Sequence, residues 1–167
     1  TFVAASTHDT EELYAAKTHL LLKKKYKNLI TIIIPRHINR VHEIVDQLNK
    51  FNLNTVTRSS KINNLKNIDI YIVDTFGESK KFYKIATSVF IGGTILRRGG
   101  QNPLEPARFG AKILHGPDVG NFKEVYSYLN TLKISFKVQT PLQCANSIIF
   151  KKNMTKVKKM KLLGKNI

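Results

Sequence analysis

A glycine-rich segment, residues 92–106 (GGTILRRGGQNPLEP), contains the residues of this chain best suited to bind a phosphate. It follows the apolar run 89–91 and leads into an amphipathic stretch that begins at Pro103, which predicts a strand, a glycine turn and a helix. Glycines let the main chain of such a turn approach a ligand closely, and the helix adds unpaired N–H groups and the positive end of its dipole. The glycines concerned are Gly92, Gly93, Gly99 and Gly100.

The polar residues after these glycines have a structural as well as a functional interpretation. Asn102 stands where a helix N-cap belongs, Pro103 at the first helical position and Glu105 in the first turn, and all three favour helix stability. A carboxylate beside a phosphate site can also accept hydrogen bonds from a ribose. The glycine spacing differs from G-x-G-x-x-G, and no Walker lysine followed by Ser or Thr is present, so these two nucleotide-binding classes are disfavoured.

Apolar runs alternate with amphipathic stretches along the chain. Strands are predicted near residues 1–5, 29–34, 53–57, 69–73, 88–91, 111–114 and 134–138. Helices are predicted near residues 9–26, 39–51, 77–86, 102–110, 121–131, 141–151 and 154–164. Runs such as 29–34 (LITIII) are continuous rather than alternating, as a parallel strand covered on both faces requires. The predicted fold class is therefore α/β, a Rossmann-like, doubly wound, mainly parallel sheet flanked by helices.

In such a sheet ligands bind beyond the carboxyl ends of the strands, and in this chain those positions are polar. Each residue alone can be explained as a helix cap or a solvated side chain. Together they predict a ligand cleft that faces the glycine turn. The candidates are Ser6, Thr7 and His8 after the first strand, Pro35, Arg36 and His37 after the second, Arg58 and Ser59 after the third, and Asp74 and Thr75 after the fourth.

The chain has 167 residues, of which 42% are hydrophobic, and this predicts one domain over residues 1–167. Its formal net charge of +17 attracts polyanions. Much of this charge lies in lysine clusters at 23–25, 80–81 and 151–165, which are typical of solvated faces or of a compositional bias. No nucleic-acid-binding motif is present, so we expect no nucleic-acid partner, and an anionic membrane surface is the better expectation for the basic tail.

Cys144 is the single cysteine, which excludes an internal disulfide framework and a cysteine-rich metal site and fits a reducing cytosol. No cluster of His, Asp or Glu has metal-ligand spacing, so neither a metal nor another cofactor is expected. No apolar run approaches the roughly 20 residues that cross a bilayer. The chain lacks an initiator methionine and begins within an apolar run, and we expect it to be a fragment of a longer protein.

Five segments together resemble a known family: STHDTEE (6–12), PRH (35–37), DTFGE (74–78), GGTILRRGGQNPLEP (92–106) and GPDVGNF (116–122). In this order they are similar to the C-terminal half of the 3-deoxy-D-manno-octulosonic acid (Kdo) transferases, which are GT-B glycosyltransferases. The chain departs from the family pattern at Thr10 (usually Gly), Phe76 (Met), Thr94 (Ser), Arg97 (Pro) and Gln101 (His). Because a glutamine does not titrate, an acid–base role at position 101 is disfavoured.

The resemblance implies that the chain binds the sugar nucleotide CMP-Kdo. The CMP phosphate is then expected against the main chain of Gly92, Gly93 and Thr94 and the turn of Gly99 and Gly100 before Asn102, with Glu105 near the ribose. Pro35, Arg36 and His37 are expected to line the nucleotide side, with Ser6, Thr7 and His8 at the interdomain cleft. Arg58, Arg97 and Arg98 are further candidate anion contacts. The sequence leaves open whether Arg97, Arg98 and Arg108 meet the donor phosphate, the Kdo carboxylate or the acceptor phosphate.

The resemblance also implies a metal-independent, inverting transfer of Kdo to a lipid A precursor at the cytoplasmic face of the bacterial inner membrane. The general base, the acceptor site and the membrane anchor belong to an N-terminal domain that the chain lacks, so we expect the chain to bind CMP or CMP-Kdo without turnover. Two alternatives remain open. One is the donor domain of another nucleotide-sugar transferase or of an epimerase. The other is a noncatalytic basic domain that binds polyanions.

Overall fold

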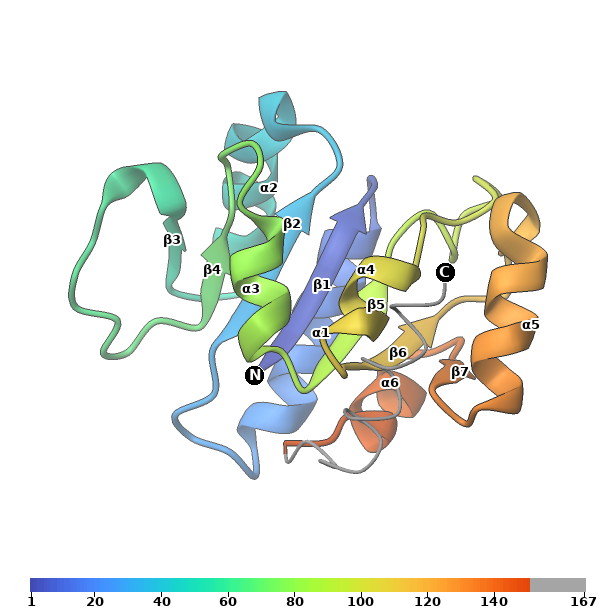
Figure 1. Cartoon of the computed structure of the whole chain (residues 1–167). Coiled ribbons are helices and arrows are strands. Elements are labelled where there is room, and N and C mark those ends of the chain that lie inside the picture. The colour runs from blue at the N-terminus through green and yellow to red at the C-terminus, as the bar shows by residue number, and fades with distance from the viewer. Residues whose placement is uncertain (151–167) are drawn as a thin grey trace.

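The structure is a computed structural model that describes residues 1–150, in which a seven-stranded sheet lies between two layers of helices (Figure 1). The strand order is β3-β4-β2-β1-β5-β6-β7, and every neighbouring pair is parallel. The strands are β1 (Phe2–Thr7), β2 (Thr31–Pro35), β3 (Thr55–Thr57), β4 (Ile70–Ile72), β5 (Ser88–Ile91), β6 (Lys112–His115) and β7 (Ser135–Lys137). This arrangement confirms the predicted α/β fold class.

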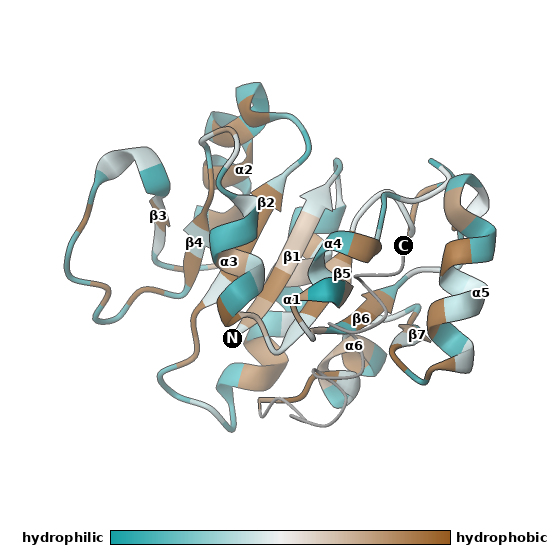
Figure 2. Ribbon diagram, viewed as in Figure 1, coloured by the Kyte–Doolittle hydropathy of each residue, from teal (hydrophilic) through white to brown (hydrophobic). Residues whose placement is uncertain are grey.

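The helices divide between the two faces of the sheet. Helices α1 (Glu11–Lys23), α2 (Val41–Asn49) and α6 (Pro141–Ser147) pack on one face, and α3 (Ser79–Ile85), α4 (Leu104–Arg108) and α5 (Lys123–Thr131) pack on the other. Short 3-10 helices cover Ile38–Arg40, Arg58–Ser60 and Gly120–Phe122. Figure 2 shows hydrophobic and hydrophilic residues alternating around α5, as a helix with one buried face requires.

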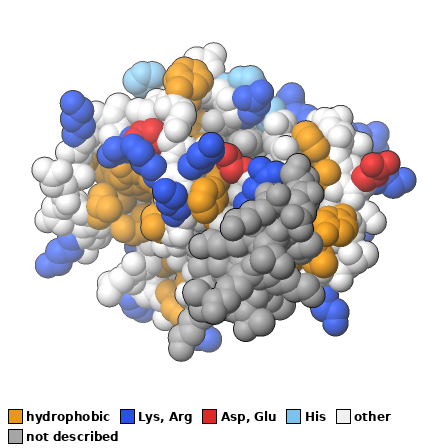
Figure 3. All heavy atoms as spheres, in the orientation of Figure 1, with side chains coloured by type: hydrophobic (Ala, Val, Ile, Leu, Met, Phe, Trp, Pro, Cys, Tyr) orange, Lys and Arg blue, Asp and Glu red, His pale blue; other side chains and the backbone are white. Residues whose placement is uncertain are grey.

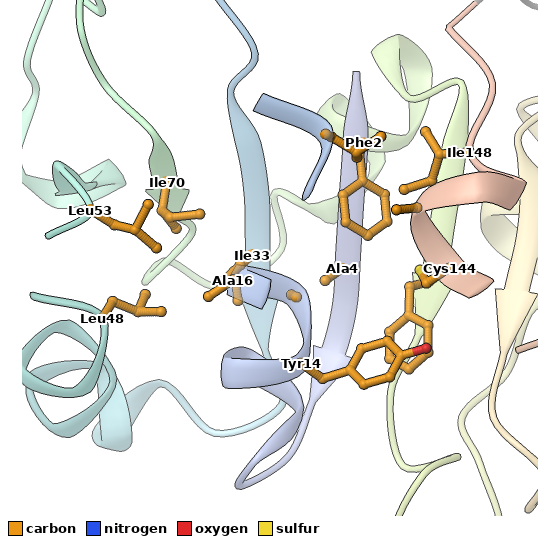
Figure 4. Close-up of a cluster of buried hydrophobic side chains, with 14 of the residues drawn as sticks. Phe2, Ala4, Tyr14, Ala16, Ile33, Leu48, Leu53, Ile70, Cys144 and Ile148 are labelled. Atoms are coloured by element: carbon orange, nitrogen blue, oxygen red, sulfur yellow. The ribbon is translucent and has the colours of Figure 1, made fainter. Parts of the chain in front are cut away.

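Both faces of the central strands are buried because successive side chains point to opposite sides. Phe2 and Ala4 of β1 belong to the cluster beneath α1 and α6, where they lie near Tyr14 and Cys144 (Figure 4). Val3 and Ala5 belong to the cluster on the opposite face. This two-sided burial explains why the strands appear in the sequence as continuous apolar runs rather than as alternating ones.

The helices are shorter than the sequence pattern predicted, and local backbone conformation sets their ends. Helix α1 begins at Glu11, because Thr10 has a left-handed conformation with φ 70°. Helix α6 ends at Ser147, because Ile148 is extended. Helix α4 begins at Leu104, two residues after its predicted start. The helix predicted at 154–164 lies outside the described residues.

The side on which strands are added to the sheet changes at β1, which pairs with β2 on one side and with β5 on the other. The chain first adds β2, β3 and β4 on one side of β1, with β4 inserted between β2 and β3, and it then returns to add β5, β6 and β7 on the other side. Loops that leave the carboxyl ends of β1 and β5 therefore diverge, and such a switch point is where open α/β sheets bind ligands. Ser6 at the end of β1 and Gly92 after β5 lie at this point.

The Lys and Arg side chains on the face shown in Figure 3 are scattered among hydrophobic and acidic ones. Within residues 1–150, no helix has both the length and the apolar character needed to span a bilayer.

A buried polar cluster joins α1 to the sheet at the end of the strands that is remote from the switch point. The Nδ1 atom of His19 lies 2.9 Å from the hydroxyl of Thr31, and its Nε2 atom lies 3.4 Å from Oδ1 of Asp69. Lys23 forms an ion pair with the same carboxylate, so the Asp69 charge is already neutralised. Burial, with a smaller contribution from Lys23, therefore lowers the pKa of His19 to about 4 despite the nearby carboxylate.

This lowered pKa predicts an acid-sensitive fold. The unfolded chain binds a proton at His19 near the ordinary pKa of 6.5, whereas the folded chain binds one only near pH 4. The contribution of neutral His19 to stability is therefore present above pH 6.5 and is lost as the pH falls toward 4. We expect about 2 kcal/mol of it to be lost between pH values of about 7 and about 5. Urea unfolding of the wild type and of His19→Asn at both pH values measures it. Equal pH slopes for the two proteins would contradict this assignment.

Candidate functional site

A cavity of about 590 Å³ opens at the carboxyl ends of β1, β2 and β4, between helices α3 and α4. Its volume falls in the range of small-molecule sites in proteins. The residues that line it are Ser6, Ile34, Pro35, Arg36, Ile38, Val73, Thr75, Phe76, Gly77, Ser79, Tyr83, Gln101, Asn102, Leu104, Glu105 and Arg108. The cavity thus occupies the switch point where the sequence predicted a ligand cleft.

The structure brings several of the predicted site residues together in this cavity, namely Ser6, Pro35, Arg36, Asn102 and Glu105. Asn102 does not occupy the N-cap, which is Pro103, but its Oδ1 accepts a hydrogen bond of 2.9 Å from the Leu104 amide. Its side chain therefore still caps an otherwise unpaired N–H group.

Of the residues that α3 and its preceding loop contribute to the cavity, the sequence predicted Thr75 but not the others. Phe76 is 81% exposed although it lines the cavity, and Gly77 next to it has φ 74°. The signal was available, because both residues belong to the DTFGE segment on which the resemblance rested. Tyr83 forms a deeper part of the wall, and burial raises the pKa of its phenol to about 12, so it is a neutral hydroxyl group at pH 7.

Two arginines give the cavity a positive charge. Arg36 follows β2, and its amide donates a 2.9 Å hydrogen bond to the Thr7 carbonyl, which fixes the start of its loop beside β1. Arg108 comes from the last turn of α4. Within residues 1–150, neither guanidinium forms a salt bridge. Glu105, whose Oε1 lies 3.7 Å from the Lys80 Nζ, is the acidic group of the wall.

The amides of the glycine turn, which the sequence predicted to bind the phosphate, are already hydrogen-bonded within the protein. The N–H groups of Gly93, Thr94 and Ile95 donate to the Glu11 carboxylate at 2.7, 3.1 and 3.1 Å. Glu11 is fully buried. A phosphate cannot rest on the Gly93 and Thr94 amides in this arrangement, because the carboxylate already occupies the position and carries the same sign of charge.

The other glycines of the segment also have structural roles, in close packing at Gly92 and in hydrogen bonds of the main chain at Gly99 and Gly100. A Cβ atom on Gly92 would lie 2.2 Å from the Ser6 carbonyl oxygen, so only glycine allows β5 and β1 to end this close together. Gly99 donates its amide to Asp118 Oδ2 at 2.7 Å, and the Gly100 amide donates to the Gly93 carbonyl at 2.8 Å. These amides are therefore also occupied, which corrects the prediction that they hold the phosphate.

Hydroxyl groups near the turn are likewise used within the fold. The Thr94 hydroxyl donates to the Ile91 carbonyl at 2.6 Å and accepts from the Gly116 amide at 2.7 Å, which ties the end of β5 to the end of β6. The Thr7 hydroxyl donates to Glu12 at 2.9 Å. Both side chains are fully buried, so neither hydroxyl is free to contact a ligand, although the sequence placed both residues among the candidate site residues.

His8 and His37 lie together beside the turn rather than in the cavity wall. Their ring centroids are 5.7 Å apart in an edge-on arrangement. The Nε2 atom of His8 lies 3.5 Å from the Gln101 amide nitrogen, and Gln101 itself lines the cavity. Burial is the main cause that lowers the pKa of His8, so its ring is neutral at pH 7.

The three arginines predicted as further anion contacts do not line this cavity. Arg58 donates to both oxygens of Glu78, at 3.1 and 3.3 Å, so its guanidinium is already paired. Hydrogen bonds from Arg58, and then from Lys81 and Thr75, lower the pKa of Glu78 to about 2. Arg97 and Arg98 are exposed on the loop that follows the glycine turn.

Thr10 carries a backbone strain that a single substitution can relieve. Its φ of 70° lies in the left-handed region, which costs a residue with a Cβ atom about 1–2 kcal/mol. We expect Thr10→Gly to raise the free energy of unfolding by about 1 kcal/mol, after the entropic cost of glycine is subtracted. Urea unfolding measures the change, and Thr10→Ala, which keeps the Cβ atom, is the control. A stabilisation of the same size in Thr10→Ala would contradict the strain argument.

Comparisons with known proteins agree with the motifs. The 3-deoxy-D-manno-octulosonic acid transferase of Haemophilus influenzae is 34% identical over 128 residues, which cover 77% of this chain and 30% of that protein. The transferase of the same name from Rickettsia prowazekii is 30% identical over 164 residues, covering 98% of this chain and 35% of that protein. No protein-family profile matches the chain.

A solved structure has the same fold. The C-terminal CMP-Kdo binding domain of WaaA from Acinetobacter baumannii superimposes with a TM-score of 0.83, at 23% identity, over 99% of this chain and 86% of that domain. Against the sequence relatives, in contrast, the chain spans about a third of the whole length. By sequence, this chain is a relative of the 3-deoxy-D-manno-octulosonic acid transferases and corresponds to about one third of such a protein.

Proposed function

We propose that this chain is the donor-binding part of a Kdo transferase and that the switch-point cavity holds the CMP portion of CMP-Kdo. The observation that carries the proposal is the cavity itself, which collects Arg36, Asn102 and Glu105 at the carboxyl edge of the sheet. Its support comes from the transferase relatives and from the fold shared with a CMP-Kdo binding domain. Each of the three motifs PRH, DTFGE and NPLEP contributes to the cavity wall.

The lining suggests where each part of the nucleotide binds. The guanidinium of Arg36 suits the phosphate, because charge-assisted hydrogen bonds from arginine to phosphate are short and can be bidentate. Glu105 is an acceptor for the hydroxyl groups of the ribose. The exposed ring of Phe76 offers an apolar face against which the cytosine can stack. The occupied amides of residues 93–95 take no part in phosphate binding.

The reaction proposed for the whole protein is an inverting transfer to a lipid A precursor. A hydroxyl oxygen of the acceptor attacks the anomeric carbon of Kdo, the bond from that carbon to the phosphate oxygen breaks, and CMP leaves with the electron pair. The acceptor proton passes to a general base outside this chain. Arg36 and Arg108 supply positive charge for the phosphate that CMP carries away, so this chain contributes electrostatic stabilisation without a metal.

The remaining parts of the proposal concern the rest of the protein. We assign the acceptor site, the general base and the attachment to the cytoplasmic face of the inner membrane to the part of the relatives that this chain does not span. The chain alone is therefore expected to bind the donor and to catalyse no transfer. Transfer of Kdo by the isolated chain would contradict this division of labour.

Titration with CMP tests the proposal. We expect saturable binding of one CMP per chain, with backbone amide shifts concentrated at Arg36, Phe76 and Asn102. UMP serves as the control for other donors, and a heparin titration serves as the control for general polyanion binding. Equal affinity for UMP would favour another nucleotide-sugar transferase. Binding of heparin that weakens steeply with salt, without saturable CMP binding, would favour the polyanion-binding alternative.

A further inference from the structure

Glu11 places a carboxylate inside the fold where three successive main-chain amides converge. The amides of Gly93, Thr94 and Ile95 donate to it, and so does the His8 amide at 3.0 Å. Consecutive N–H groups that point to one position form a nest for an anion. In this chain the anion is a fully buried side chain supplied from 82 to 84 residues away.

The turn that Glu11 holds is connected to the cavity wall by short contacts. The Gly93 carbonyl accepts the 2.8 Å hydrogen bond from the Gly100 amide, and Gln101 and Asn102 follow directly in the wall. A Cβ atom on Gly93 would also lie 3.5 Å from the Gln101 amide nitrogen. The 93–95 turn therefore lies against the segment that leads into residues 101 and 102, and it is one of the contacts that position them, together with the Tyr126 hydroxyl that donates to the Gln101 carbonyl at 2.9 Å.

We propose that Glu11 is a positioning residue: its carboxylate acts as a built-in anion that holds the 93–95 turn and thereby keeps Gln101 and Asn102 in place for the donor. The ligand side of this inference rests on the proposed function. It also specifies that the donor phosphate binds on the Arg36 side of the cavity, because the nest is filled by a group of the same charge. The glycine turn is thus preorganised by the protein before any nucleotide arrives.

Glu12 provides a matched control for this role. It is the next residue, it is equally buried, and it also accepts hydrogen bonds, from Thr7 at 2.9 Å and from Arg40 at 3.2 Å. No hydrogen bond joins it to the 93–95 turn within the described residues. Removal of Glu12 therefore reports the general cost of losing a buried carboxylate at the start of α1.

Chemical rescue is the decisive experiment. In Glu11→Ala the removed side chain leaves space beside four unpaired amides, which acetate can occupy. We expect CMP affinity to fall at least about tenfold and the amide resonances of Gly93, Thr94 and Ile95 to shift. Acetate should restore both toward the wild-type values, whereas chloride at equal ionic strength should not. Glu12→Ala should lower stability without moving these resonances and without a response to acetate.

A second variant covers the case in which Glu11→Ala fails to fold. Glu11→Gln keeps the shape but places an NH₂ group against donor amides, so CMP affinity should fall and acetate should bring no recovery. Wild-type CMP affinity in either folded variant, or tighter binding because phosphate enters the vacated nest, would overturn the proposal. If the wild type binds no CMP, the proposed function fails, and the acetate response of the three amides still decides the role of Glu11.

Discussion

Replacement of Gly92 by alanine is expected to lower the free energy of unfolding by about 3 kcal/mol or more. The added Cβ atom would lie 2.2 Å from the Ser6 carbonyl oxygen, 2.6 Å from its carbonyl carbon and 2.7 Å from the Thr7 Cα atom. All three are backbone atoms, which cannot rotate away, so β1 and β5 must separate at their carboxyl ends. Because those ends form the switch point, the cavity should change shape together with the loss of stability.

Gly120→Ala is the control for this substitution. Neither Gly92 nor Gly120 has a left-handed conformation, so alanine can adopt the backbone angles at both positions. The nearest atom to a Cβ on Gly120 is Asp118 Oδ1 at 3.7 Å, which is an ordinary contact. Urea unfolding of the two variants should therefore separate steric cost from conformational cost. If Gly92→Ala is as stable as Gly120→Ala, the close approach of β1 to Gly92 is wrong.

Replacement of Arg36 by methionine is expected to weaken CMP binding about tenfold to a hundredfold, while the free energy of unfolding changes little. Methionine keeps the apolar stem and removes the guanidinium, which is exposed and forms no salt bridge within residues 1–150. The lost interaction is the charge-assisted hydrogen bond to phosphate, so binding of cytidine, which has no phosphate, should be unchanged. Calorimetric titration with both ligands measures the difference.

Lys17→Met controls for the loss of one positive charge from a chain of net charge +17. Lys17 is exposed on α1 and does not line the cavity. An equal loss of CMP affinity in both variants would show that the general field of the protein, and not a contact at Arg36, attracts the phosphate. An unchanged affinity in Arg36→Met would instead place the phosphate elsewhere, with Arg108 as the next cation of the same cavity.

The pattern of residue types along the chain was enough to predict the fold class and the edge of the sheet at which the candidate site lies. Continuous, mostly apolar runs such as 29–34 are typical of strands buried on two faces, and their alternation with amphipathic segments favours parallel strands joined by helices. Residues directly after parallel strands share one edge, so the sequence grouped Ser6 and Arg36 with the glycine segment that follows residues 88–91 and leads to Asn102. These inferences depend on the spacing of apolar residues and on the order of strands and helices, and both can be read from the sequence.

The contacts of each group at that edge could not be predicted in this way, because they depend on segments that are distant in sequence. The Gly93 and Thr94 amides were expected to bind a ligand, and Glu11, which is distant in sequence, fills them instead. Arg58 was expected to meet an anion, and Glu78 from the next loop pairs with it. A motif fixes residue types and their local geometry, but the partner of a buried donor or of a charge depends on which remote backbone packs within about 3 Å of it. Which groups come that close is determined only when the helices pack against the sheet.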